Sequence, residues 1–263
     1  MIPYLVVCTA AFLTAGLTLF SGFGLGTILM PVFALFFPVE VAVAATAVVH
    51  FAHNVFKVGV VGGLADRSLV LRFGLPAMAA ALVGAVALGL VARVHALVAY
   101  NLGPLEAEVT PIKLVMAVLM LVFAMFELVP VLRRLRFGKE HLVLGGVLSG
   151  FFGGFSGHQG ALRAAFLARV SAKTETFVGT NAVLGFLVDV SRLLTYAALF
   201  FFAGEKSPVG AQEWPLIFAG IGAAFFGVIL GKRYLHAIRM KTIQTLTGIL
   251  LLMIAAALGA GLV

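Results

Sequence analysis

The sequence predicts an all-α membrane protein whose helices cross the bilayer many times. Of its 263 residues, 62% are hydrophobic and 11% are charged, and a soluble domain cannot bury that much apolar surface. The apolar residues stand in long continuous runs rather than in short alternating stretches, so helices and not β-strands are the spanning elements. Lys and Arg gather in the short segments between these runs, where the positive-inside rule places them.

Several apolar runs reach the length of about 20 residues that a spanning helix needs. The predicted spans are residues 39–62, 68–92, 112–132, 175–203, 214–231 and 241–262. Two further apolar stretches, 1–37 and 141–170, are each interrupted by a glycine-rich sequence, SGFGLG at 21–26 and SGFFGGFSGHQG at 149–160. We therefore expect about eight to ten helices, and each broken stretch forms either a re-entrant hairpin or a pair of helices broken in the membrane.

The placement of charge predicts the topology. Clusters of Lys and Arg, predicted to be cytoplasmic, lie at 67–72, 133–140, 163–173 and 232–241. The loops at 101–110 and 204–213 are acidic or neutral and are predicted to lie outside. From the inside linker at 133–140 to the outside loop at 204–213, the chain must cross the membrane an odd number of times. The helix 175–203 supplies one crossing, so 141–170 must enter the membrane and return to the cytoplasmic side. The same count makes 1–37 enter and return on the outer side, and it places both termini outside.

An internal repeat supports this topology. Shifting the first half by a constant 135 residues (175 − 40 = 135) aligns Glu40 with Glu175 and keeps chemical type at several other positions. The aligned pairs are Ser21/Ser156, Gly22/Gly157, Thr46/Asn181, Phe51/Phe186, Asn54/Asp189 and Lys57/Arg192. We therefore expect two inverted-topology repeats in a single membrane domain, 1–135 and 136–263. Each has one broken, re-entrant helical element and three transmembrane helices.

Inverted repeats with broken helices are the construction of secondary transporters, in which half-helix ends meet at a substrate site. If short helices start after each break, their positive N-terminal ends favour an anion. Glycines there allow the chain to turn and to approach a ligand closely. Close helix packing is the more common reason for any single glycine, whereas two repeat-related clusters beside polar residues favour a site. The candidate substrate-binding residues are Gly22, Phe23, Gly24, Asn54, Gly157, His158, Gln159, Arg163 and Asn181.

Arg163 is the preferred charge for holding the anion. Its guanidinium fork matches two oxygens of a sulfonate, and it has no acidic residue within one helical turn. Its alternative role is a positive topology signal of the inner loop. Arg192 is less suited to the ligand, because Asp189 lies three residues before it and can neutralise it.

Further polar residues form a stripe on one helical face, at Thr46, His50, His53, Asn54 and Lys57. Polar groups in hydrocarbon are costly unless they are paired or wetted, so this stripe faces the protein interior. The candidates for coupling transport to an ion gradient are His50, His53, Lys57, Asp189 and Arg192, with Glu127 as a further carboxylate. Alternatives remain: Lys57 can snorkel to the cytoplasmic edge, Asp189 and Arg192 can form a structural ion pair, and the histidines can be packing residues.

Three segments resemble the TauE/SafE family of sulfite and organosulfonate exporters, also called the sulfonate uptake permease family. They are GFGLGTILMP (22–31), PVEVAVAATAVVHFAHN (38–54) and GGVLSGFFGGFSGHQGA (145–161). The likeness covers nearly the whole chain, with Leu25 where that family usually has glycine and His158–Gln159 where it usually has small residues. The resemblance implies a multi-pass carrier of the bacterial inner membrane. It would export sulfite, sulfoacetate, thiosulfate or a related organosulfonate, driven by an ion gradient through alternating access.

Two other functions stay open: an anion channel on the same fold, and an intramembrane enzyme using His50 and His53. The sequence contains no H-E-x-x-H, G-x-S-x-G or nucleotide-binding loop, so we expect neither an enzyme nor an ATP-driven pump. Cys8 is the only cysteine, which excludes a cysteine-based metal site. We expect no metal, no cofactor and no nucleic acid; the expected partners are the small anion and the lipid bilayer, and a homodimer stays open.

Overall fold

The computed structural model describes residues 1–21, 24–103, 105–171, 173–202, 209–234 and 240–263. Within them the chain forms eleven α-helices and one two-stranded sheet. The first half contains α1 (Ile2–Ser21), α2 (Leu25–Ala34), α3 (Val39–Val61), α4 (Arg67–Ala92), β1 (Val98–Leu102), β2 (Leu105–Val109), α5 (Pro111–Leu128) and α6 (Pro130–Arg133). The second half contains α7 (Leu142–Ser156), α8 (Gly160–Leu167), α9 (Thr174–Phe202), α10 (Trp214–Tyr234) and α11 (Met240–Gly259).

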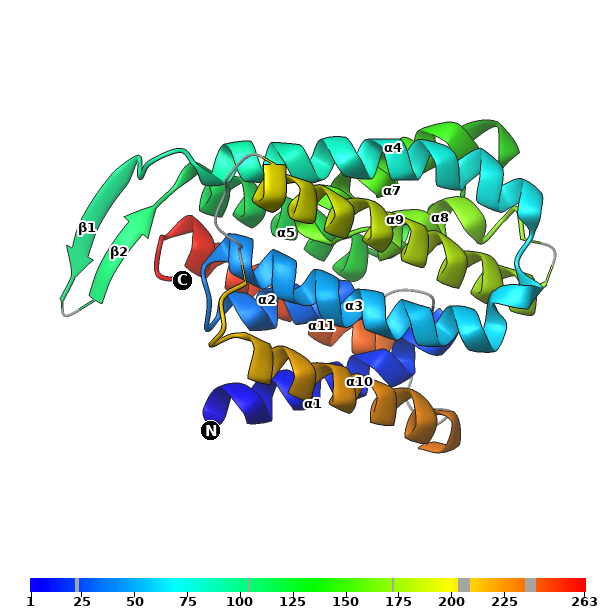
Figure 1. The fold of residues 1–263 in the computed structure, drawn as a ribbon, viewed down its shortest axis with the longest axis horizontal. Helices are drawn as coiled ribbons and strands as arrows, with labels where there is room; N and C mark the ends of the chain where they lie inside the picture. The colour runs from blue at the N-terminus through cyan, green and yellow to red at the C-terminus, as the bar shows by residue number, and fades with distance from the viewer. Residues whose placement is uncertain (22–23, 104, 172, 203–208, 235–239) are drawn as a thin grey trace.

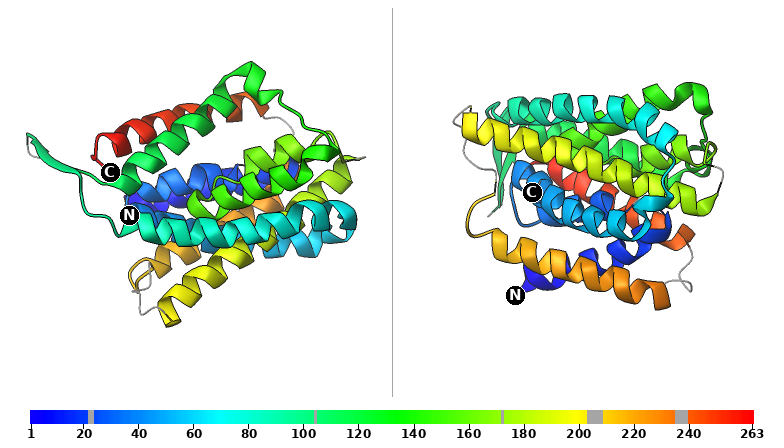
Figure 2. Two further views of the ribbon diagram at one scale, coloured as in Figure 1. Left: turned by 90° about the horizontal axis from the view of Figure 1, so that it is seen from above. Right: turned by 45° about the vertical axis from the view of Figure 1, so that its right-hand side comes forward.

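The helices lie side by side in one bundle whose long axis follows the helix axes (Figure 1). Both termini and the β1–β2 hairpin lie at one end of this bundle, and the connection from α3 to α4 lies at the other end. Figure 2 shows α5 and α11 running next to each other in a pair. The bundle thus places the chain ends on the same side as the segment between α4 and α5.

The length of the helices and the apolar surface of the bundle identify a membrane protein. Among the described residues, α3, α4, α5 and α9 each contain a stretch long and apolar enough to cross a bilayer. Shorter apolar stretches lie in α1, α2, α10 and α11. Large apolar side chains stay exposed along outer helix faces, and on α4 they are Leu71, Leu75, Leu82, Val83, Val86 and Leu90. A soluble protein does not expose apolar surface on that scale.

Both glycine-rich stretches interrupt a helix, as the sequence predicts. The first stretch gives α1 and α2, and the second gives α7 and α8. The element bounds follow the repeat offset: α1 ends at 21 and α7 at 156, α2 begins at 25 and α8 at 160, and α3 begins at 39 and α9 at 174. Each of these three pairs differs by 135 (156 − 21, 160 − 25, 174 − 39).

Helix packing across the halves is reciprocal. In the first half α1 packs along α10, and in the second half α7 packs along α4. In addition, α3 packs against α9, and α5 against α11. The contact of α7 with α4 is close because Gly150 and Gly154 lie against the backbone, where an added Cβ would stand 2.1 Å from the carbonyl oxygens of Ala77 and Ala81. For these two glycines close helix packing is therefore the correct interpretation.

The structure corrects the end of the span predicted over 112–132. Helix α5 ends at Leu128, and a separate single turn, α6, follows. The cause is Pro130, which has no N–H to donate and forces the residue before it out of the helical region; Val129 has ψ 118°. The extra turn α6 also brings the number of helices in the described residues to eleven rather than eight to ten.

A second correction concerns the segment 101–110, which was expected to be only a loop. Strands β1 and β2 pair in an antiparallel hairpin, with Val98 opposite Val109 and Leu102 opposite Leu105. Gly103 in the turn has φ +64°, a conformation that glycine adopts without steric cost. The hairpin is tied to the end of the chain, because the Tyr100 hydroxyl donates to the carbonyl oxygen of Ala260 at 2.6 Å.

Candidate functional site

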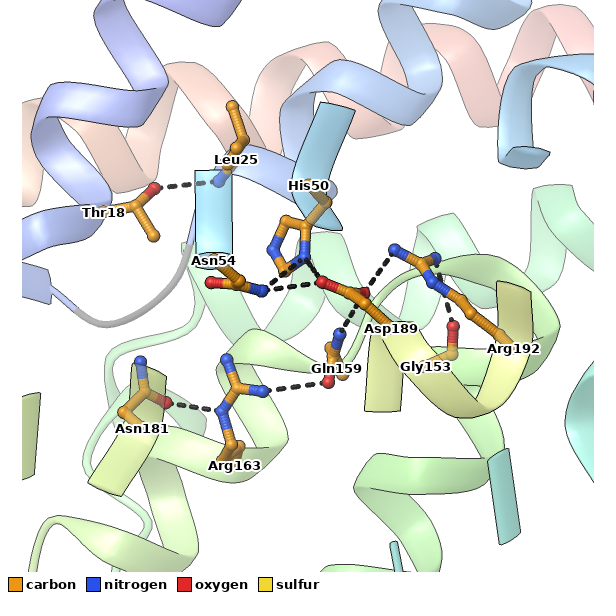
Figure 3. A network of polar contacts seen from close by, with 10 residues as sticks. All are labelled: Thr18, Leu25, His50, Asn54, Gly153, Gln159, Arg163, Asn181, Asp189 and Arg192. Atoms are coloured by element: carbon orange, nitrogen blue, oxygen red, sulfur yellow. Dashed lines mark hydrogen bonds and ion pairs between the residues drawn. The ribbon is translucent and has the colours of Figure 1, made fainter. Parts of the chain in front are cut away.

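A buried polar network surrounds Asp189, a residue of α9 that is fully buried (Figure 3). Its Oδ2 accepts a hydrogen bond from Asn54 Nδ2 at 2.7 Å and lies 2.7 Å from His50 Nδ1. Its Oδ1 lies 2.7 Å from Arg192 Nη2 and accepts a longer bond from Gln159 Nε2 at 3.3 Å. Each carboxylate oxygen thus has two partners, which is what a buried carboxylate needs to stay ionised. The ion pair of Asp189 with Arg192, one of the alternatives that the sequence offers, is present on α9.

The packing of α3 on α9 brings this network together. Phe51 of α3 stacks on Phe186 of α9, with 5.7 Å between ring centroids. Gly185 of α9 lies opposite Asn54, and an added Cβ there would stand 2.8 Å from Asn54 Nδ2 and 3.2 Å from Arg163 Nη1. The absence of a side chain at Gly185 is therefore what lets the amide and the guanidinium approach α9.

Arg163 extends from α8 into the same region, with 3% of its surface exposed. Its Nε donates to Asn181 Oδ1, and its Nη1 donates to Gln159 Oε1 at 2.9 Å. Both acceptors are neutral amides, so they orient the guanidinium without neutralising it. Asp189 attracts Arg163 from a longer distance but already pairs with Arg192. The described residues thus leave Arg163 as a buried cation with no carboxylate of its own, an arrangement that is costly without a counter-ion.

The two helix breaks lie against each other. Gly157 caps α7 with φ +79°, and Gly24 precedes α2 with φ +129°. Gly26, in the first turn of α2, faces Gly157 so closely that an added Cβ would stand 2.9 Å from its carbonyl oxygen. At the first break the Leu25 N–H donates to Thr18 Oγ1 at 3.0 Å. Two of the candidate residues, Gly22 and Phe23, lie outside the described residues.

Two buried cations bind the ends of the broken helices in matching ways. Lys57 Nζ donates to the carbonyl oxygen of Thr18 at 3.3 Å, and Arg192 Nη1 donates to that of Gly153 at 3.3 Å. Both carbonyls belong to the last turn of a helix, the end of the helix dipole that attracts positive charge; the Gly153 oxygen also accepts the Gly157 N–H at 3.2 Å. Both donor–acceptor pairs are 39 residues apart, and both donors and acceptors differ by the repeat offset (192 − 57 = 153 − 18 = 135). Lys57 is 1% exposed, so the alternative that it snorkels to the edge is wrong.

The three candidate histidines have different surroundings. His50 belongs to the Asp189 network. His53 is fully buried and neither ring nitrogen makes a hydrogen bond to the described residues, although the backbone of Ala15 lies nearby. His158 contacts the Ser156 carbonyl through Nδ1 at 3.0 Å and stacks on Phe123 of α5, with 5.0 Å between ring centroids.

The structure thus gathers most of the predicted residues and separates a few. Asn54, Gln159, Arg163 and Asn181 join the coupling candidates His50, Asp189 and Arg192 in one connected set, which Figure 3 shows. The side chain of His158 instead packs between its own turn and α5.

Sequence reasoning missed two contributors, Thr18 and Gly185, and it counted Gly153 only among the glycines of the second break. The repeat offset pairs Thr18 with Gly153, and His50 with Gly185, so the aligned halves carried a signal for all of them. In the part of the chain that the structure describes, no three His, Cys, Asp or Glu residues gather as metal ligands.

These features define a class: a polytopic α-helical membrane protein with a buried, cation-rich centre where two interrupted helices meet. The chain belongs to the sulfite exporter TauE/SafE family, whose model matches residues 7–258. It is thereby a member of a transporter family for sulfite and related sulfur anions. Searches of curated proteins and of solved structures gave no match.

Proposed function

We propose that this protein is a secondary transporter that exports a small sulfur-containing anion across the bacterial inner membrane by ion-coupled alternating access. The substrate class is sulfite, sulfoacetate, thiosulfate or a related organosulfonate. The observation that carries the proposal is Arg163, a buried guanidinium beside a helix break with no carboxylate partner among the described residues.

The chemistry of Arg163 fits an oxyanion. A guanidinium presents five N–H donors in a planar fork that matches two oxygens of one anion, and its charge persists at any physiological pH. Asn181 and Gln159 hold Nε and Nη1, so the fork is oriented before the substrate arrives. Neutral amides can yield these donors to an anion, because charge-assisted hydrogen bonds are roughly twice as strong as neutral ones.

The proposed architecture is a pair of inverted repeats, 1–135 and 136–263. Three observations support it: the shared offset of the element bounds, the reciprocal packing of α1 on α10 and α7 on α4, and the matched cation–carbonyl bonds. Repeats of this kind let one half rock against the other around a fixed site. The end that carries both termini and the hairpin is proposed to face the periplasm, because the basic clusters at 67–72 and 133–140 lie in segments at the other end.

Ion coupling is assigned to the groups that share the network with the substrate site. Asp189 lies between His50 and Arg192, so a change in the charge of His50 alters the balance around the carboxylate directly. Histidine is the side chain most suited to exchange protons near neutral pH. His53, one turn along α3, is the second candidate.

A flux assay with the purified protein in proteoliposomes tests the proposal. We expect saturable counterflow of labelled sulfite that is stimulated by a proton gradient and lost in Arg163→Ala. Arg169→Ala is the matched control, because Arg169 follows α8 and is exposed; it should transport normally. An ohmic current without counterflow would instead identify a channel, and chemical conversion of the anion would identify an enzyme.

A further inference from the structure

The buried centre contains more positive than negative charge. Among the described residues around the two breaks, the structure buries three cations, Lys57, Arg163 and Arg192, and one carboxylate, Asp189. Asp189 pairs with Arg192 at 2.7 Å, which leaves two positive charges (three minus one) with the histidines neutral. Glu127, the other buried carboxylate among the described residues, lies at the far end of α5 in a small cleft with Arg133 and Arg136.

Lys57 is an ammonium with three N–H donors. Among the described residues it has one hydrogen bond, at 3.3 Å to the carbonyl oxygen of Thr18. Its repeat mate Arg192 has Asp189 three residues earlier, whereas the residue three before Lys57 is the neutral Asn54. Lys57 therefore binds the end of α1 as Arg192 binds the end of α7. The first half has no carboxylate at the position from which Asp189 neutralises Arg192 in the second half.

Lys57 and Arg163 are both buried in the same interior. Arg163 and Lys57 repel each other electrostatically across the interior, and Asn54 lies one turn before Lys57 on α3. Asn54 and Arg163 both approach the bare backbone at Gly185, as the 2.8 Å and 3.2 Å approaches to an added Cβ there show. Two unneutralised cations held near each other in a buried site are stable only when something negative lies between them.

We propose that Lys57 is a second substrate-binding cation and that Lys57 and Arg163 together select a dianionic sulfur oxyanion over a monoanionic sulfonate. The Arg163 fork binds two oxygens, and the free donors of Lys57 bind a third oxygen or the second charged end. A dianion neutralises both residual charges, whereas a monoanion leaves one buried charge uncompensated. This assignment rests on the proposed transport function and moves Lys57 from ion coupling to the substrate site.

Thiosulfate and methanesulfonate are suitable probes, because they are a dianion and a monoanion with a similar oxyanion head and neither changes charge near neutral pH. Binding of each to the detergent-solubilised protein is measured by calorimetry, for the wild type, Lys57→Gln and Lys57→Arg. Lys173→Gln is the matched control, since Lys173 is exposed just before α9. Thermal unfolding of each variant shows whether it is folded.

We expect the wild type to bind thiosulfate at least about tenfold more tightly than methanesulfonate. Lys57→Gln should weaken thiosulfate by about tenfold or more and methanesulfonate by less than about threefold; Lys57→Arg and Lys173→Gln should keep the preference. The assignment would be overturned if Lys57→Gln weakened the binding of both anions equally, or if the wild type did not prefer thiosulfate. If Lys57→Gln fails to fold, the ratio of the two affinities in the wild type still decides. Absence of any sulfur-anion flux in the wild type would instead overturn the proposed transport function.

Discussion

Asn54 donates a hydrogen bond to Asp189 at 2.7 Å, and the two residues are 135 positions apart in the chain. The same separation relates Phe51 and Phe186, which stack one turn earlier (186 − 51 = 135). Residues that touch their own repeat mates must lie beside the axis that relates the halves. The proposed two-fold axis therefore passes between α3 and α9, and the charged network is built on it. An amide faces a carboxylate there, so the centre departs from symmetry at its most charged contact.

The first prediction concerns Arg163. Arg163→Lys keeps the charge and loses the fork, so substrate affinity should fall by about tenfold; Arg163→Ala removes both and should lower it by about a hundredfold. Binding of sulfite by calorimetry measures the effect, with Arg169→Ala as control. If Arg163→Ala bound sulfite with wild-type affinity, Arg163 would not hold the anion, and the backbone of the breaks, His158 and Gln159 would be the remaining candidates.

The second prediction concerns Asp189. Asp189→Asn leaves Arg192 as a buried unpaired charge, which should lower the stability by about 3 kcal/mol. Thermal unfolding in detergent measures the loss, and Glu175→Gln, at an exposed position of the same helix, should change little. Because the cost comes from the orphaned guanidinium, the double variant Asp189→Asn/Arg192→Gln should recover part of it. A double variant less stable than Asp189→Asn alone would contradict that explanation.

The third prediction tests the contact between the breaks. In Gly26→Ala the new Cβ would stand 2.9 Å from the Gly157 carbonyl oxygen, so the breaks must separate, at a cost of about 1–3 kcal/mol. Transport of labelled sulfite should fall while the protein remains folded. Gly59→Ala on α3, where no heavy atom lies within 4 Å of the added Cβ, is the control. Full transport in Gly26→Ala would mean that this contact is unimportant for function.

The fourth prediction concerns membrane orientation. In a Cys8→Ser background, cysteines placed at Asn101 in the hairpin and at Leu262 near the C-terminus should react with an impermeant maleimide added to intact cells. A cysteine at Lys139, an exposed position in the linker between α6 and α7, should react only after permeabilisation. Labelling of the Leu262 position from the cytoplasm alone would contradict the inverted-repeat topology.

The sequence predicts the long spans, the two breaks and the Asn54–Asp189 correspondence, because these depend on local hydrophobicity and on a repeat visible in the chain itself. It does not predict which glycines pack helices and which turn the chain. Gly154 and Gly157 are three residues apart in one motif, yet Gly154 lies against Ala81 of α4 while Gly157 has a left-handed backbone. That difference depends on a partner helix far away in sequence.

His158 shows the same limit for side chains. Its position beside the break suggested a ligand contact, but the turn at Gly157 directs the ring toward Phe123 of α5. Lys57 shows the same limit in the opposite direction. Helix length alone placed it near an edge of the membrane, whereas the end of α1 supplies a buried carbonyl oxygen that accepts a hydrogen bond from its ammonium. In both cases the deciding neighbour belongs to another element.

The hairpin between α4 and α5 has a mechanical consequence. It leads directly into α5, and it also fastens the residues after α11, through Tyr100 to the Ala260 carbonyl and through the Glu108 N–H to the Gly261 carbonyl at 3.0 Å. Sliding α5 along α11 would break both bonds, whereas swinging the two helices together keeps them. The α5–α11 pair is therefore joined at one end by the hairpin, and a rearrangement that keeps both bonds moves the two helices together.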